Sequence, residues 1–215
     1  MLKPVIYLFF LMTMINNSGA IAASAEQPIP EVKSGTIKRL ANFNSQFVPN
    51  RHIDIWLPEG YSTKQKYDVL YMHDGQMLYD ANITWNKQEW QVDEVAGKLM
   101  AEGKVKPFIV VGIFNSGKTR FPEYFPQKVH EALSTEQKAE AKQKLKQHNK
   151  LDVDLENYYF ADNYGKFLVQ EVIPYLESNF SVNKGAAHRY LAGSSMGGLV
   201  SWYTLLSYPQ QFAGA

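Results

Sequence analysis

The sequence contains no cysteine among its 215 residues. Disulfide bonds, thiol nucleophiles and cysteine-ligated zinc are therefore excluded for this chain. The 22 lysine and arginine residues nearly balance the 21 aspartate and glutamate residues, and no basic stripe is visible, which argues against nucleic acid as a partner. The sequence also lacks an H-x-x-x-H or H-x-H pair, so we expect neither a metal site nor a cofactor.

Long hydrophobic runs are also scarce, and the apolar segment at residues 5–15 is too short to span a membrane as a helix. It follows the basic start Met1-Leu2-Lys3 and precedes Ala23-Ser24-Ala25, which is typical of a cleaved secretory signal. We predict a signal peptide over residues 1–25, with cleavage after Ala22 as the alternative. The mature protein is then expected to be periplasmic or secreted, with no stable membrane insertion.

Residues 26–215 are predicted to form one α/β domain, because the chain is long enough for one core and shows no internal repeat. Apolar runs at 67–72 and 107–113 flank a helical pattern at 90–100, and this order predicts a largely parallel sheet with helices on both faces. Residues 36–43 and 52–57 are expected to form an antiparallel pair before it. A helix over 162–180 should be interrupted at Pro174 and bury one face, made of Tyr164, Phe167, Leu168, Val172 and Leu176. Val95 in the pattern at 90–100 and Leu206 in a helix at 199–208 are also expected to be buried.

The irregular segment 115–159 contains a lysine- and glutamate-rich stretch at 134–150, which begins with a capping box. We expect a solvated surface helix there. A mobile lid, or a docking arm for an acidic partner, is the alternative.

The pattern G-x-S-x-G occurs at Gly193-Ser194-Ser195-Met196-Gly197, between a short apolar strand and a predicted helix. This context is typical of a nucleophile elbow, where a sharp turn lifts a serine above the sheet. Ser195 is then the nucleophile, and the backbone N–H of Met196 can face a developing oxyanion at the helix N-terminus. A plain glycine-rich turn is the alternative interpretation.

Together with two other stretches, this motif resembles the putative-esterase (esterase D-like) family of α/β-hydrolases. The stretches are Val69 to Asp80, which contains His73-Asp74-Gly75-Gln76, and Val110 to Ile113 with Arg120 and Glu123-Tyr124. The family includes enterochelin-type siderophore esterases, feruloyl and acetylxylan esterases, and S-formylglutathione hydrolases. The similarity extends from about residue 36 to residue 215.

The resemblance implies an α/β-hydrolase fold and a serine esterase that forms an acyl-enzyme on Ser195. It implies the N–H of Gln76 as second oxyanion donor, beside Gly75, whose backbone can approach the substrate. Arg120 and Tyr124 are candidate substrate-binding residues, with Trp85 and Trp90 as further candidates for the same wall. Arg120 could instead pair with Glu123, and Trp90 could belong to the core. The substrate would be a small-molecule or polysaccharide-linked ester.

One departure from the family concerns the rest of the triad, whose order is serine, then acid, then histidine. Residues Met196 to Ala215 contain no Asp, Glu or His, so we expect a fragment that lacks the C-terminal strands. All five histidines precede Ser195. We expect His188 far from the site, His130 and His148 at the surface, and His73 with Asp74 orienting the oxyanion loop.

Two alternatives to an esterase stay open. An acyltransferase would use the same acyl-enzyme, and a non-catalytic hydrolase-like binding protein would result if the chain truly ended at Ala215.

Overall fold

The computed structural model describes residues 27–149 and 158–215, so the predicted signal peptide lies outside the described residues. Within them the chain forms a five-stranded sheet with the order β1-β2-β4-β3-β5. The strands are β1 (Thr36–Phe43), β2 (Arg51–Leu57), β3 (Asp68–His73), β4 (Phe108–Ile113) and β5 (Arg189–Ala192).

The central part of this sheet is parallel, as predicted. Strand β3 pairs in parallel with β4 on one side and with β5 on the other. The first two strands form the expected antiparallel pair, and β2 also runs antiparallel to β4. Helix α1 (Val92–Ala101) connects β3 to β4, which is the strand–helix–strand unit that a parallel pair requires.

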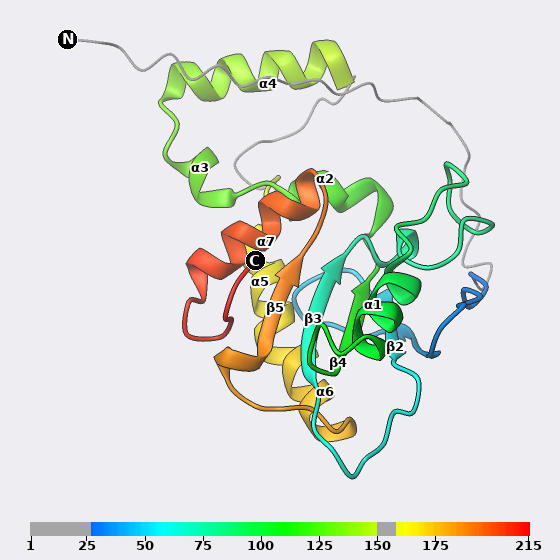
Figure 1. The fold of residues 1–215 in the computed structure, drawn as a ribbon. Helices are drawn as coiled ribbons and strands as arrows, with labels where there is room; N and C mark the ends of the chain where they lie inside the picture. The colour runs from blue at the N-terminus through cyan, green and yellow to red at the C-terminus, as the bar shows by residue number, and fades with distance from the viewer. Residues whose placement is uncertain (1–26, 150–157) are drawn as a thin grey trace.

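Helices cover the sheet on both faces, as Figure 1 shows, with α1 in front and α5 and α6 behind. On β3, Val69 and Tyr71 belong to the larger core, which includes buried residues of the helices behind the sheet. Leu70 and Met72 point the other way and pack against the smaller cluster, which contains Ala96 of α1. This alternation explains why the strand is apolar throughout its length.

The interruption predicted near Pro174 takes the form of a π-helix. Helix α5 (Ala161–Lys166) continues into the π-helical segment η4 (Phe167–Val172) and then into α6 (Ile173–Asn179). Proline has no N–H to donate and its ring collides with the carbonyl four residues earlier, so the hydrogen-bond pattern must change there. The predicted buried side chains on this unit are indeed buried; they are Tyr164, Phe167, Leu168, Val172 and Leu176.

Between β4 and α5 lie α2 (Arg120–Tyr124), α3 (Gln127–Glu131) and α4 (Thr135–Asn149). The capping box of α4 is confirmed, because the N–H of Ser134 donates to Gln137 Oε1 at 2.8 Å and the N–H of Gln137 donates to Ser134 Oγ at 3.3 Å. Figure 1 shows α4 standing away from the sheet, in agreement with a surface helix.

Three predictions of exposure are wrong. Val95 and Leu206 were assigned to buried helix faces but are exposed, and buried polar groups take the inner positions instead: Asp93 on α1, and Ser201 and Thr204 on α7 (Met196–Ser207). Asp93 is tolerated there because it accepts the backbone N–H groups of Lys33 and Ser34.

Histidine 130 is the third case. It was expected at the surface, but its ring packs 4.8 Å from that of Tyr159 and is buried. The side chain of His148 lies outside the described residues.

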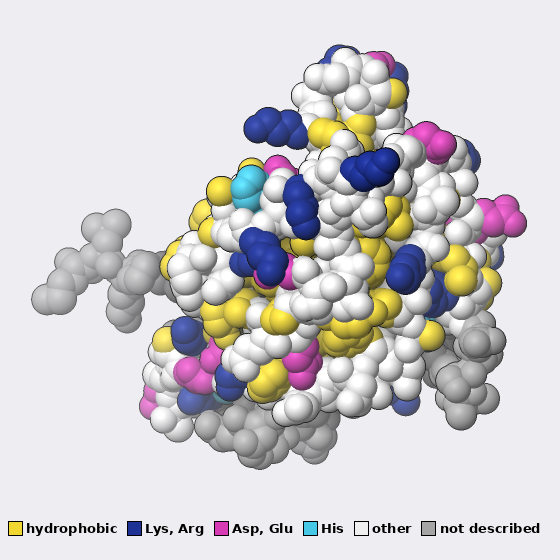
Figure 2. Space-filling view, turned by 90° about the horizontal axis from the view of Figure 1, so that it is seen from below, with side chains coloured by type: hydrophobic (Ala, Val, Ile, Leu, Met, Phe, Trp, Pro, Cys, Tyr) yellow, Lys and Arg dark blue, Asp and Glu magenta, His cyan; other side chains and the backbone are white. Residues whose placement is uncertain are grey.

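On the face shown in Figure 2, lysine and arginine side chains are interspersed with acidic and apolar ones. Within residues 27–149 and 158–215, no helix is both long and apolar enough to cross a membrane. The same residues contain no group of three or more His, Asp or Glu side chains arranged to hold a metal ion.

Candidate active site

Ser195 lies at the turn between β5 and α7, where the sequence predicted the elbow. Its backbone has φ 54° and ψ −118°, and the residue is exposed. A non-glycine residue in this sparsely populated region typically costs about 1–3 kcal/mol, so the surrounding fold must impose the conformation. The turn is tight, because a Cβ on Gly193 would lie 2.5 Å from the carbonyl carbon of Gly197.

Two backbone N–H groups near this turn are available for a ligand. Met196 is the first residue of α7, so its N–H has no acceptor within the helix. Neither this N–H nor that of Gln76 donates a hydrogen bond to any other described residue. Such unpaired donors at a helix N-terminus and on a loop are suited to an anionic oxygen.

Strand register brings the elbow next to the loop after β3. Met72 pairs with both Gly112 of β4 and Ala192 of β5, so the residues that follow these strands meet at one edge of the sheet. A Cβ on Gly197 would lie 3.2 Å from Asp74 Oδ2. The first turn of α7 therefore contacts the loop that carries Gln76.

Asp74 is the best-connected residue of that loop. It adopts a left-handed conformation, with φ 59°, and its carboxylate is buried. Arg120 donates from Nε to Oδ1 and from Nη2 to Oδ2, both at 2.7 Å, and Asn115 Nδ2 donates to Oδ1 at 2.7 Å. Burial alone would lower the pKa of Arg120, but the hydrogen bonds and charge of Asp74 raise it.

These contacts exclude the alternative pairing of Arg120, which binds Asp74 and not Glu123. They also show how Asp74 holds the loop, because its carboxylate binds the side chains of Arg120 and Asn115. The physical reason is that Glu123, three residues along the same short helix, faces the sheet and binds Arg51. Because its guanidinium is bound to Asp74, Arg120 has a structural role in holding the loop after β3.

Gly75 and Tyr124 have packing roles as well. A Cβ on Gly75 would lie 2.4 Å from the carbonyl carbon of Gly112, so the loop can rest on β4 only with glycine there. Tyr124 is completely buried, with its ring 5.2 Å below the guanidinium of Arg120. Its ring supports Arg120 and does not line an open surface.

His73 is completely buried at the end of β3. Its Nδ1 is hydrogen-bonded to the hydroxyl of Tyr164 at 2.8 Å, and its Nε2 has no partner among the described residues. Burial lowers the pKa of His73 to about 4. A neutral, fully enclosed imidazole held by Tyr164 favours the predicted structural role over that of a general base.

His188 is remote from this edge, as predicted. Its Nδ1 is bonded at 2.6 Å to Asp68, the first residue of β3, so it lies at the opposite end of the strands. His52 is on β2, where its Nδ1 accepts the N–H of Asn42 at 3.1 Å.

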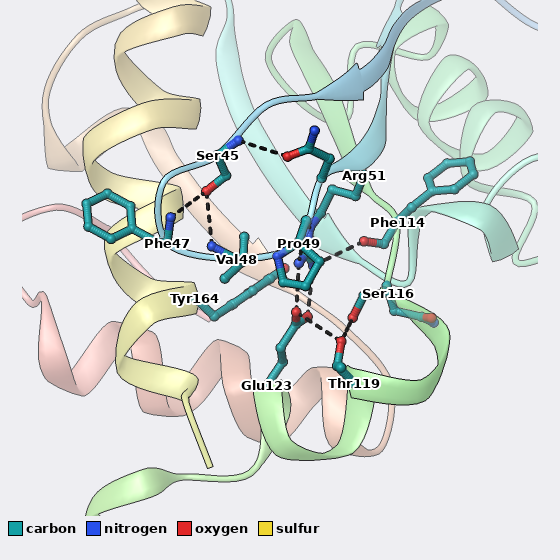
Figure 3. A network of polar contacts seen from close by, with 12 residues as sticks. Ser45, Phe47, Val48, Pro49, Arg51, Phe114, Ser116, Thr119, Glu123 and Tyr164 are labelled. Atoms are coloured by element: carbon teal, nitrogen blue, oxygen red, sulfur yellow. Dashed lines mark hydrogen bonds and ion pairs between the residues drawn. The ribbon is translucent and has the colours of Figure 1, made fainter. Parts of the chain in front are cut away.

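The sequence analysis missed a buried network behind the loop, which Figure 3 shows. Arg51, at the start of β2, donates two hydrogen bonds to Glu123, at 2.9 and 2.7 Å. Both side chains are almost fully enclosed, with exposures of 1% and 0%, and the Arg51 guanidinium also lies 5.5 Å from the ring centre of Tyr164. The available signal was the position of Arg51, which falls on the same face of the strand as Ile53 and Ile55.

A hollow of about 310 Å³ adjoins the other side of the loop, with a lining of mixed polar and apolar groups. Half of its ten lining residues carry side-chain amides; they are Gln27, Asn42, Asn50, Gln76 and Asn115. Asn115 also ties the loop to this hollow, because its N–H donates to Gln76 Oε1 at 3.2 Å. Of the two candidate tryptophans, Trp85 is 79% exposed and Trp90 packs against the smaller core.

Comparison with known proteins places this geometry in context. The chain is 25% identical over 193 residues to an endo-1,4-beta-xylanase/feruloyl esterase of Xylanibacter ruminicola, covering 85% of this chain and 21% of that protein. A ferulic acid esterase structure from the fungus Anaeromyces mucronatus matches with a TM-score of 0.57 and 22% identity, over 88% of this chain and 60% of that one. An IroE-like serine hydrolase from Shewanella oneidensis matches with a TM-score of 0.54 and 27% identity, over 83% of this chain and 48% of that one.

The chain thus spans only part of these relatives, 60% of the length or less in each case. Their structures establish the α/β-hydrolase fold. The family model for esterases, described as putative esterase, matches residues 45–215. The chain therefore belongs to the putative-esterase family of α/β-hydrolases.

Proposed function

We propose that this protein hydrolyses carboxylic esters through an acyl-enzyme formed on Ser195. The observation that carries the proposal is the strained backbone of the exposed Ser195 just before α7, together with the N–H groups of Met196 and Gln76, which have no acceptor among the described residues. Family membership and the feruloyl esterase relatives support the same reaction class.

In the proposed reaction, Ser195 Oγ forms a bond to the ester carbonyl carbon while its proton passes to a base. The negative charge then lies on the former carbonyl oxygen, where the N–H groups of Met196 and Gln76 can donate to it. The C–O bond to the alcohol breaks, and the alcohol leaves with the proton from the base. Water repeats the addition and releases the acid.

The base must be a group other than the enclosed His73. In the triad of this fold the base is a histidine that is held by an acid, and we propose the same pair of groups for Ser195. The pH dependence of kcat/KM tests this, because a histidine base loses activity as it is protonated below about pH 6.5. The absence of hydrolysis at any pH would favour the non-catalytic alternative.

The substrate is proposed to be an ester with a polar alcohol, small or linked to a polysaccharide. The carboxamide-lined hollow next to Gln76 supports this, since side-chain amides both donate to and accept from hydroxyl groups. Export is part of the same proposal and is supported by the signal-like pattern of residues 1–25.

The decisive experiment uses the protein encoded by its full reading frame, with p-nitrophenyl acetate and methyl ferulate as substrates. Hydrolysis should be lost in Ser195→Ala, and mass spectrometry should locate a trapped acyl group on Ser195. Ser194→Ala is the matched control, because Ser194 is the adjacent exposed serine, and it should retain activity. Equal activity in Ser195→Ala and the parent would refute the proposal. Transfer to an added alcohol in preference to water would identify an acyltransferase.

A further inference from the structure

The carboxylate of Asp74 lies between two helices at the candidate site. From α2 it receives two hydrogen bonds of Arg120, each 2.7 Å long. On its other side is the first turn of α7, where a Cβ on Gly197 would lie 3.2 Å from Oδ2. The carboxylate is thus hydrogen-bonded to α2 and packs against the first turn of α7, so it lies between the loop that carries the Gln76 N–H and the helix that carries the Met196 N–H.

The loop is also held along its length. Met77 donates its N–H to the carbonyl of Asp74 at 2.9 Å, and Asn115 bonds both Asp74 and Gln76. Gly75 rests against β4. Arg120 differs from these groups, because it lies on a separate helix and binds the loop through a bidentate ion pair with Asp74.

The helix that carries Arg120 is itself anchored. Glu123, one turn further along α2, is bound to Arg51 of β2 at 2.7 Å inside the core. Thr119, the residue before α2, donates to the same carboxylate at 3.4 Å and bonds Ser116, as Figure 3 shows. A helix of only five residues is not stable through its own hydrogen bonds alone. The contacts of Glu123 and Thr119 therefore fix the position of the Arg120 backbone, from which its side chain extends.

We propose that Arg120 is a positioning residue that sets the spacing of the two oxyanion donors through Asp74. The inference rests on the proposed function for the meaning of those donors. A planar guanidinium holds a carboxylate in one orientation through two parallel bonds, whereas a lysine ammonium holds it as a point charge. The geometry of Arg120, and not only its charge, is therefore what the site requires.

The test compares Arg120→Lys with Arg39→Lys. Arg39 binds Asp54 through the same atoms, Nε to Oδ1 and Nη2 to Oδ2, at the same 2.7 Å, but between β1 and β2. The two variants lose the same kind of contact. Only Arg120→Lys is expected to lower kcat, by about 10- to 100-fold with KM within about twofold, because misplaced donors weaken the transition state and not substrate binding.

Two further readouts separate positioning from other roles. The affinity for a phosphonate transition-state analogue should fall in Arg120→Lys in proportion to kcat/KM, while the affinity for the product acid should change little. Amide hydrogen exchange at residues 74–77 should accelerate at least tenfold in Arg120→Lys and stay unchanged in Arg39→Lys. The exchange measurement does not require activity.

Unchanged kcat and exchange in Arg120→Lys would overturn the inference. A rise in KM alone would identify Arg120 as a substrate-binding residue and would also overturn it. Failure of the proposed function is distinguishable, since then Ser195→Ala would equal the parent while the exchange difference between the two arginine variants persisted.

Discussion

The imidazole of His73 and the hydroxyl of Tyr164 form a fully buried hydrogen bond of 2.8 Å that joins the end of β3 to α5. His73 is the last residue of β3 and immediately precedes Asp74, so this hydrogen bond anchors the start of the oxyanion loop. Burial lowers the pKa of His73 to about 4, and the imidazole is therefore neutral in the folded protein at neutral pH.

Because His73 is buried in its neutral form, the free energy of unfolding should fall as the solution becomes acidic. The pKa of His73 is about 4 when folded and 6.5 in the reference state, so the unfolded chain binds a proton first as the pH falls. The contribution of neutral His73 to the free energy of unfolding is fully present above about pH 6.5. It is lost as the pH falls toward 4, and the free energy of unfolding then drops by at most about 1.4 kcal/mol per pH unit. Urea denaturation between pH 7.5 and 4.5 measures it.

The control is His73→Asn, which removes the titrating group. This variant should be less stable at every pH because it leaves a space in the core, but its stability should depend less steeply on pH. Parallel pH profiles of the two proteins would show that another group causes the loss.

Breaking the Arg51–Glu123 pair should be strongly destabilising. Glu123→Ala leaves an enclosed guanidinium without its partner, which typically costs about 3–5 kcal/mol. Arg51→Met with Glu123→Leu should recover much of this loss, because no charge is then left unpaired. Chemical denaturation of the three proteins provides the comparison.

An exposed ion pair serves as the reference for this prediction. Lys144 and Glu140 are 2.7 Å apart on α4 with side-chain exposures of 65% and 63%, and removal of that pair should change the free energy of unfolding far less than removal of the buried pair. Similar losses at both sites would contradict the role given to burial.

Much of the fold could be predicted from sequence because its signals are local. The apolar runs of β3 and β4, the glycines around Ser195 and the proline in the helix before β5 each constrain their own segment, whatever surrounds it. The elbow was found in the same way, whereas the loop at Gly75 and Gln76 was found through its resemblance to a family motif. The strand register then brings the two together.

The charge pairing could not be predicted, because it depends on which segments the fold brings together. Arg120 and Glu123 are close enough in sequence to pair, yet Asp74 binds the first from a loop 46 residues away and Arg51 binds the second from a strand 72 residues away. His130 was assigned to the surface for the same reason, since the Tyr159 ring that covers it is supplied by a distant segment.

Adding one methyl group at Gly75 should displace the oxyanion loop. A Cβ there would lie 2.4 Å from the backbone of β4, and overpacking of this kind typically costs about 1–3 kcal/mol. Gly75→Ala should therefore unfold at a lower temperature than the parent and hydrolyse esters more slowly. Gly214→Ala, whose nearest atom would be 3.8 Å away, should behave like the parent.

A substitution that relieves the backbone strain at Ser195 should raise the free energy of unfolding. Glycine adopts a positive φ without steric cost, so Ser195→Gly removes about 1–3 kcal/mol of strain while it adds about 0.5–1 kcal/mol of chain entropy to the unfolded state. We expect Ser195→Gly to be about 1 kcal/mol more stable than Ser195→Ala, with both inactive. Urea denaturation of the two variants measures the difference.

The neighbouring serine provides the matched comparison. Ser194 has no positive φ, so glycine relieves nothing there and Ser194→Gly should be less stable than Ser194→Ala by about 0.5–1 kcal/mol. The sign of the Gly-minus-Ala difference should therefore reverse between two adjacent positions. The same sign at both positions would mean that the turn does not force Ser195 into a strained conformation in solution, and the structural basis for assigning it as the nucleophile would be removed.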